Sequence, residues 1–172
     1  ERLLDVKATR RRAADVLAER YAKSGDARRE AAVLALLIEE SKDVALRTEI
    51  GERLATVYDS KLGSYSSALD VMLRAVREAS AEVRLWERAE LLAISAGRPT
   101  DLADAYKEVL RGKLDEEVEV DLSERASRWH EDRLGDPIGA TPYLERVLAL
   151  RPTTESAFRR LKDILTAAER WG

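Results

Sequence analysis

A glycine-containing turn recurs along this chain at nearly constant spacing. Its four copies are centred on Gly25, Gly63, Gly97 and Gly135, which lie 38, 34 and 38 residues apart. Spacing of this size is typical of solenoids built from helix pairs. Glycine at a helix end can adopt the left-handed conformation that closes the helix without a clash at Cβ. The repeat therefore predicts a series of helix pairs, each folded back on itself at one of these glycines.

The residues that follow the glycines are suited to starting a helix. Asp26, Ser64 and Asp136 each carry a side-chain oxygen that can cap the next helix. Pro99 and Pro137 fit the first helical turn, where a missing backbone N–H has little effect. Each turn is thus predicted to end one helix and begin another.

Apolar residues recur between the turns with the period of an α-helix. In the second unit, for example, Leu46, Ile50 and Leu54 fall on one stripe. Nine helices are predicted, at about residues 2–24, 27–41, 44–61, 65–79, 82–96, 99–112, 116–134, 137–150 and 154–170. Each stripe is too narrow to be buried by its own helix, so neighbouring pairs are expected to stack and bury the stripes as one continuous core.

The composition supports this all-α prediction. Hydrophobic residues make up 45% of the chain, enough for a core, and charged residues make up 37%, which suits helices with wide solvated faces. Short polar links between the units favour antiparallel neighbours. We predict a right-handed α-α superhelix, or solenoid, that forms a single domain over residues 1–172 and is a fragment of a longer array. Its units are expected at about residues 2–41, 44–79, 82–112, 116–150 and, in part, 154–172.

The turn and the small residues after it resemble the tetratricopeptide repeat family, including its half-a-tetratricopeptide variety. Two units carry the family's spacing: Gly63, Tyr65, Ala68, Met72 and Ala75 in one, and Gly135, Ala140, Leu144, Val147, Leu150 and Pro152 in the other. Ala157, Phe158 and Leu161 match positions that open a following first helix, and Trp86 stands where the family often has tryptophan. The resemblance covers residues 44–170 well and residues 1–43 less closely. Two first helices are one residue longer than the family's unit.

Residues that could carry catalysis or bind a metal are few. His130 is the only histidine and cysteine is absent, so no second imidazole or thiolate can complete a metal site. We interpret His130 as an exposed or half-exposed helical residue rather than a general base oriented by a carboxylate. The acidic residues at 39–40 and 115–119 are interpreted as solvated or helix-capping groups. No phosphate-binding loop is present. The chain is therefore predicted not to be an enzyme and to need no cofactor or metal.

The charge distribution bears on the kind of partner. The net charge is −3, which argues against nucleic acid as a partner. Residues 1–30 are nonetheless basic and residues 101–136 acidic, and Arg10, Arg11 and Arg12 form one dense basic run that we interpret as a solvated helix face. No apolar run is long enough to span a bilayer, and the first residues do not resemble a signal peptide. A cytoplasmic location and a bacterial source are expected.

The resemblance implies protein–protein recognition in a groove lined by the first helix of each unit. Polar positions of these helices are the candidate partner-binding residues: Glu49, Glu52, Thr56, Asp59, Arg84, Glu87, Arg128, Glu131, Arg159 and Asp163. Their mixed signs fit a partner segment with alternating charges. The leading hypothesis is a protein-interaction scaffold that binds another protein or peptide segment. Two alternatives remain: a helical repeat scaffold of the RNA-processing type, and a regulatory or substrate-recruiting domain of a larger enzyme.

Overall fold

The computed structural model describes the backbone of residues 2–169 and the side chains of residues 13–168. This part of the chain is all-α, as predicted, and contains no strand. Its α-helices are α1 (Arg2–Ser24), α2 (Ala27–Glu40), α3 (Val44–Thr56), α4 (Tyr65–Glu78), α5 (Val83–Ser95), α6 (Pro99–Val109), α7 (Glu116–Trp129), α8 (Pro137–Leu150) and α9 (Glu155–Glu169). Two π-helical turns, η1 (Val57–Lys61) and η2 (His130–Leu134), continue α3 and α7.

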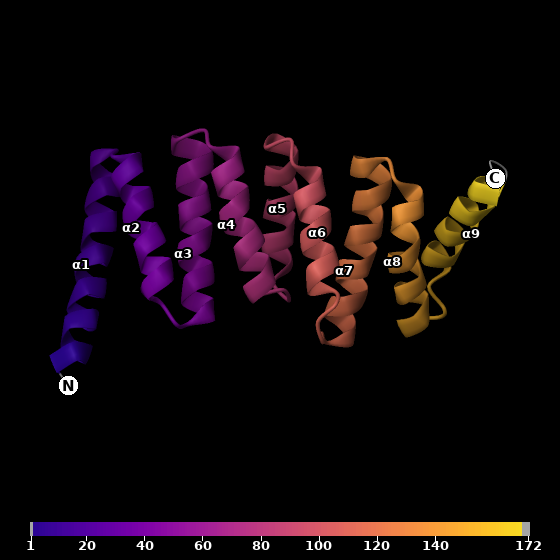
Figure 1. Cartoon of the computed structure of the whole chain (residues 1–172), viewed down its shortest axis with the longest axis horizontal. Helices are drawn as coiled ribbons and strands as arrows, with labels where there is room; N and C mark the ends of the chain where they lie inside the picture. The colour runs from indigo at the N-terminus through magenta and orange to yellow at the C-terminus, as the bar shows by residue number, and fades with distance from the viewer. Residues whose placement is uncertain (1, 170–172) are drawn as a thin grey trace. The chain divides into compact units, whose positions relative to one another are not determined.

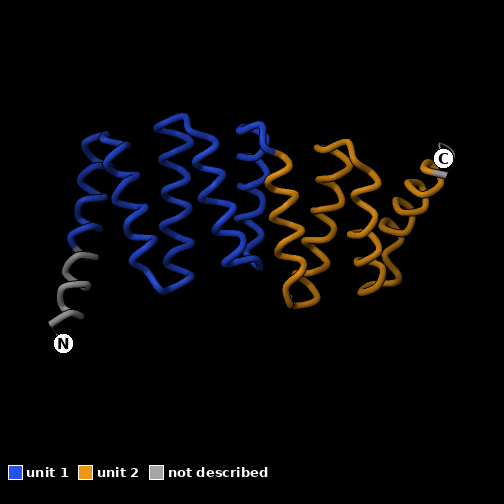
Figure 2. Tube along the Cα trace, in the orientation of Figure 1, with its two compact units in different colours: residues 1–98 blue, residues 99–172 orange. Residues whose placement is uncertain are grey.

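The helices form two compact units, Glu1–Arg98 and Pro99–Gly172 (Figure 2). Within each unit the main contacts join helices that are consecutive in the sequence, from α1 to α5 in the first and from α6 to α9 in the second. Consecutive helices run antiparallel within each unit (Figure 1). The predicted stacking of helix pairs is therefore present. The right-handed superhelix and the single domain stay predictions.

All four turn glycines adopt the left-handed conformation predicted for them, with φ between 61° and 75°. The capping prediction is also met at Asp26 and Asp136, whose Oδ1 atoms accept hydrogen bonds from the backbone N–H groups of Arg29 and Gly139. Ser64 differs, because its hydroxyl bonds to the hydroxyl of Ser67 at 2.8 Å and caps no backbone group.

The first helices of two pairs do not end as ordinary α-helices. The sequence predicts continuous helices over 44–61 and 116–134, but the last five residues of each form the π-turns η1 and η2. The backbone hydrogen bonds that close these turns join residues further apart in the sequence. Ser64 N bonds to Tyr58 O at 2.7 Å and Asp136 N to His130 O at 2.9 Å, each spanning six residues. The corresponding bond from Asp26 N, to Tyr21 O, spans five. The π-turns thus absorb the extra residue noted in two first helices.

The remaining predicted helix boundaries agree with the structure to within about one residue, except at the end of α6. Helix was predicted to residue 112, but α6 ends at Val109. The next backbone bonds, from Arg111 N to Glu108 O and from Gly112 N to Val109 O, span three residues and tighten the chain into a turn.

The core is divided among neighbouring helices. In the first unit one cluster comes from α1, α2, α3 and η1: Ala14, Ala18, Ala31, Leu34, Leu37, Ile38, Leu54 and Val57. In the second unit a cluster comes from α7, α8 and α9: Val120, Ala140, Leu144, Val147, Ala157 and Ile164. Each stripe is therefore buried by the adjacent helices, as the periodicity predicts.

The aromatic residues among the described side chains follow the apolar stripes with two exceptions. Trp86 and Trp129 are buried, and their indole N–H groups donate to the backbone oxygens of Ser80 and Pro99, both at 2.9 Å. Tyr65, in the first turn of α4, is exposed, and so is Phe158, whose side chain is 59% exposed although its position matches an aromatic position of the family. In the described part of the chain, no helix is long and apolar enough to cross a bilayer.

Candidate functional site

The ten candidate residues lie on the first helices of successive pairs, from α3 to η1, on α5, from α7 to η2 and on α9. Seven of them are exposed: Glu49, Thr56, Arg84, Glu87, Arg128, Arg159 and Asp163. The other three, Glu52, Asp59 and Glu131, are half-buried. We call the surface formed by these helices the first-helix face, and describe it separately in each unit.

In the first unit the structure brings two of the candidates together. The Nη1 atom of Arg84 on α5 donates to Oε2 of Glu52 on α3 at 2.7 Å. A hydrogen bond from Arg84 to Glu82, followed by the charge of Glu52, raises the pKa of Arg84. One turn further along, Arg88 donates to the hydroxyl of Thr56 at 2.7 Å. These contacts fasten α3 to α5, so part of the polar surface predicted for a partner is used within the chain.

In the second unit the first-helix face carries a shallow depression of about 180 Å³ between α7 and α9. Arg128, Glu131 and Asp132 line it from α7 and η2, and Ser156 and Arg160 line it from α9. The depression therefore exposes side chains of both signs, which can recognise a polar polypeptide segment.

Arg160 organises the floor of this depression. It donates to the carboxylate of Glu131 and, at 3.0 Å, to the hydroxyl of Ser127, so it fixes α9 against α7. Arg128 pairs with Glu124, one turn earlier on α7, at 3.2 Å and remains mostly solvent-exposed. Since Glu124 is the one ion-pair partner of Arg128 among the described residues, its guanidinium retains donors that can face a bound segment.

Four of the other candidates, Glu49, Asp59, Arg159 and Asp163, are not brought together in the described part of the chain. Arg159 pairs with Glu155 on its own helix at 3.0 Å, and Glu49 and Asp163 are exposed side chains on α3 and α9. Asp59 lies half-buried in the π-turn η1, and Glu87 is exposed on α5.

Sequence reasoning missed four residues of this face. Arg88 lies four residues after the candidate Arg84, and Glu124 four residues before the candidate Arg128, so a check of one-turn neighbours would have found both. Leu91, which is 67% exposed on α5, lies two turns after Arg84 and on the same side of the helix. No local pattern distinguishes Arg160, because its partners come from α7 and η2.

A buried charge network fastens the first helix pairs and was also missed. The carboxylate of Glu30, on α2, is only 3% exposed. It accepts from Nζ of Lys61 at 2.6 Å and from Nη2 of Arg53 at 3.3 Å, which come from η1 and α3. Because the carboxylate is hydrogen-bonded to two cations, we assign it to stability rather than to binding.

His130 is more enclosed than the sequence interpretation expects. Its side chain is 15% exposed, and its Nδ1 lies 3.3 Å from Oδ2 of Asp136. Its ring packs against Tyr143 at a centroid distance of 5.4 Å. A carboxylate does therefore stand beside the imidazole.

Among the described residues, no cluster of three or more histidine or acidic side chains could hold a metal ion. The basic run at Arg10, Arg11 and Arg12 lies outside the described side chains.

The fold and this face define a helical repeat protein built from antiparallel helix pairs. No family model matches the sequence, and no curated protein matches it significantly. Two solved structures of a protein called MamA are similar to the chain. One is 10% identical with a TM-score of 0.48, over 94% of this chain and 84% of that one. The other is 11% identical with a TM-score of 0.47, over 89% and 85%. A similarity this distant does not establish the function of the chain. Membership of the tetratricopeptide repeat family stays a prediction.

Proposed function

We propose that the chain is a protein-interaction scaffold whose first-helix face binds a segment of another protein. The observation that carries the proposal is the depression between α7 and α9, which is open to solvent and lined by acidic and basic side chains. A partner segment, either extended or helical, can lay its own charges against these groups. Recognition by charge and hydrogen bonding favours specificity and rapid association.

The signs of the charges narrow the class of partner segment. Glu131 and Asp132 stand beside Arg128 and Arg160, so neither sign dominates the depression. A free terminal carboxylate would need a cluster of Lys and Arg to bind it, and no such cluster lines the depression. We therefore propose an internal segment with alternating charges as the ligand.

Site-specific photo-crosslinking tests the proposal. A photoreactive amino acid would replace Arg128 or Asp163, which lie on the first-helix face, and, as a control, Glu145, which is exposed on α8. Each variant would be irradiated in a lysate of the source organism, and the crosslinked segment would be identified by mass spectrometry. We expect protein adducts from positions 128 and 163 and none from position 145.

The identified segment would then be synthesised, and its affinity measured for the unmodified chain and for Arg128→Glu. Reversing this charge should weaken binding about tenfold, because it replaces an attraction with a repulsion. Lys42→Glu, which changes an exposed residue between α2 and α3, is the control of equal charge change. Equal adducts from all positions, nuclease-sensitive adducts, or a peptide that binds Arg128→Glu as well as the unmodified chain would contradict the proposal.

The sequence raised two other roles, an RNA-processing scaffold and a recruiting domain of a larger enzyme. Both stay hypotheses, as do the cytoplasmic location and the bacterial source. The nuclease treatment of the crosslinked adducts addresses the first directly, since an RNA adduct would lose its mass on digestion.

A further inference from the structure

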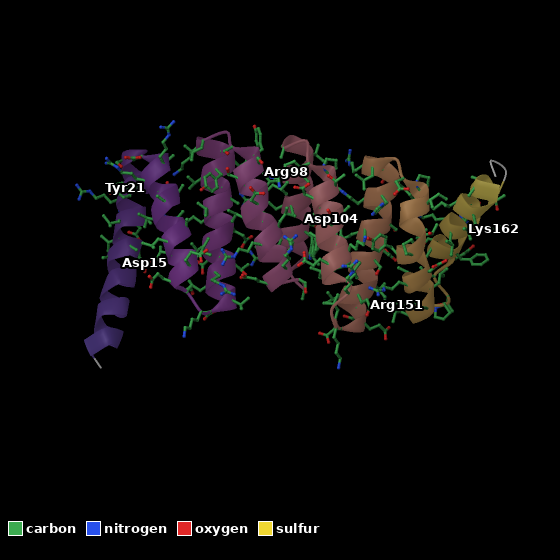
Figure 3. The ribbon with its side chains drawn as sticks, viewed as in Figure 1. Asp15, Tyr21, Arg98, Asp104, Arg151 and Lys162 are labelled. Carbon is green, nitrogen blue, oxygen red and sulfur yellow. The ribbon has the colours of Figure 1, made fainter. Side chains whose placement is uncertain are left out.

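The second unit contains a larger pocket, on the second helices rather than the first. It lies between α6 and α8, has a volume of about 420 Å³, and is also lined by His130 of η2. A pocket of this size is in the range that holds small organic molecules. Its lining combines apolar groups, among them Leu110 and Pro142, with charged side chains that include Asp104, which projects from α6 (Figure 3).

Two of the cations that line the pocket are not paired with a carboxylate of the described residues. Lys107, in the last turn of α6, and Arg111, in the turn that follows, are exposed, and neither forms an ion pair with any residue that the structure describes. Arg74 and Arg98, by contrast, are paired with carboxylates. Unpaired cations beside a partly enclosed pocket create a positive potential there that attracts anions.

The third cation of the lining, Arg146, is already bonded to other residues of the chain. Arg146, on α8, donates to the backbone oxygen of Leu110, and its Nε lies 3.3 Å from Oε1 of Glu119. These contacts hold the far wall of the pocket in place. Arg146 therefore shapes the pocket, while Lys107 and Arg111 are the cations left for a ligand.

The aromatic wall of the pocket is supported by a series of contacts. Tyr143 packs against His130, which is oriented by Asp136, and Asp136 in turn accepts from the backbone N–H of Gly139 at 2.9 Å. Burial raises the pKa of Tyr143, so its phenol stays neutral and can donate a hydrogen bond at neutral pH. A site whose side chains are fixed before binding loses little entropy when a ligand enters.

We propose that this pocket binds a small organic anion. Its phosphate or carboxylate group lies between Lys107 and Arg111, and its apolar or aromatic body lies against Pro142 and Tyr143. A bare inorganic anion would fill little of the pocket and would leave the apolar wall uncovered. The site is independent of the proposed partner-binding face, because it is built by α6, α8 and η2 and shares no lining residue with the depression between α7 and α9.

Titration of the ¹⁵N-labelled chain with four probes, followed by NMR, tests this proposal. The probes are phenyl phosphate, benzoate, inorganic phosphate and benzylamine. We expect phenyl phosphate or benzoate to give saturable shifts of the amides of residues 103–111 and 139–146, and inorganic phosphate to bind more weakly. Benzylamine should bind more weakly still, because it carries the wrong charge.

The double variant Lys107→Gln, Arg111→Gln should weaken binding of the best aryl anion about tenfold or more, since both charge-assisted contacts are lost. The matched control is Lys113→Gln, Arg133→Gln, which removes two exposed cations outside the pocket and should leave binding within about twofold. The proposal is overturned if neither aryl anion gives saturable local shifts, or if benzylamine or inorganic phosphate binds as well as they do. Equal affinities for the two double variants would overturn it too.

Discussion

At the scale of single residues, Glu30 shows how a charge can be placed inside a helical repeat. A buried carboxylate is unfavourable unless it is paired and hydrogen-bonded. Here Lys61 and Arg53 supply both the charge and the donors, and they reach in from the next helix pair. Their own side chains are about 40% exposed, so each cation keeps part of its hydration. The arrangement ties two consecutive pairs together.

Glu30→Ala is therefore expected to destabilise the fold by about 1–3 kcal/mol, because it removes the shared acceptor and leaves a small cavity. The loss is kept moderate by the exposure of Lys61 and Arg53, which can turn to solvent. Urea unfolding followed by circular dichroism measures the change. Glu49→Ala, at an exposed position of α3, should change stability by less than about 0.5 kcal/mol. Equal effects of the two substitutions would mean that the buried network contributes nothing.

Two helical glycines should respond oppositely to the same substitution. A Cβ on Gly51, inside α3, would meet Val71 at an ordinary contact distance of 3.7 Å, so Gly51→Ala should stabilise the chain by about 0.5–1 kcal/mol. A Cβ on Gly139 would lie 2.0 Å from Oδ2 of Asp136 and 2.5 Å from Nδ1 of His130. Gly139→Ala must displace the capping carboxylate, and losing a cap costs about 1 kcal/mol.

We expect Gly139→Ala to be less stable than Gly51→Ala by about 1 kcal/mol in thermal unfolding, because both variants gain helix propensity and only Gly139→Ala loses the cap. The imidazole resonances of His130 should also shift in the Gly139 variant and remain in place in the Gly51 variant. Equal melting temperatures would show that Asp136 moves aside freely.

At the scale of elements, the π-turns η1 and η2 solve a problem of register. Each ends a first helix that has one residue more than the turn at Gly25 requires, and each places that residue just before the left-handed glycine. An extra residue in the middle of a helix would rotate all later side chains by about 100° and misplace the stripe. At the end of the helix it leaves the preceding stripe intact.

This argument predicts that the position of a deletion matters more than the deletion itself. Removing Ser60, an exposed residue of η1, should convert the π-turn into an ordinary helix end and cost about 1–2 kcal/mol, mainly from the disturbed contact of Lys61 with Glu30. Removing Glu49 should cost at least about 3 kcal/mol, because Leu54 and Val57 would then turn away from the core. Denaturant unfolding of the two deletion variants compares them directly, and similar losses would refute the register argument.

At the scale of the whole molecule, stability comes from contacts between neighbouring helices rather than from one central core. In such chains the free energy of unfolding is approximately a sum of unit and interface terms. The prediction of a single domain implies that the units Glu1–Arg98 and Pro99–Gly172 unfold together.

Tryptophan fluorescence can test that prediction, since Trp86 is buried in the first unit and Trp129 in the second. Two variants would each keep one of these residues and replace the other and Trp171 with phenylalanine. In each variant the fluorescence and far-ultraviolet circular dichroism transitions in urea should coincide if the chain is a single domain. A fluorescence midpoint separate from the dichroism midpoint in either variant would show that the units unfold independently.

The fold was predictable from the sequence because its determinants are local. The left-handed conformation at Gly63 and Gly135 follows from the conformational freedom of glycine. The start of α8 follows from the capping residue Asp136 and from Pro137, which suits the first helical position. The candidate surface was predictable only in part. Glu52 and Arg84 were both candidates and do meet, but Arg160, the partner of Glu131, was not among the candidates. Each pair joins residues of different helices, so no local pattern shows which side chains will meet.

The sequence by itself determined where most helices begin and end and which side of each helix is apolar, since both depend on the conformational preferences of a few adjacent residues. Only the tertiary structure decided which charged side chains are paired within the chain and which remain available to a ligand. Arg146 is engaged while Lys107 and Arg111 are not, and Glu30 is buried while Glu49 is solvated. The physical reason is that the interaction energy of two charges depends on the distance between them and on their burial. Packing sets this distance and this burial, and it brings together residues that are far apart in the chain.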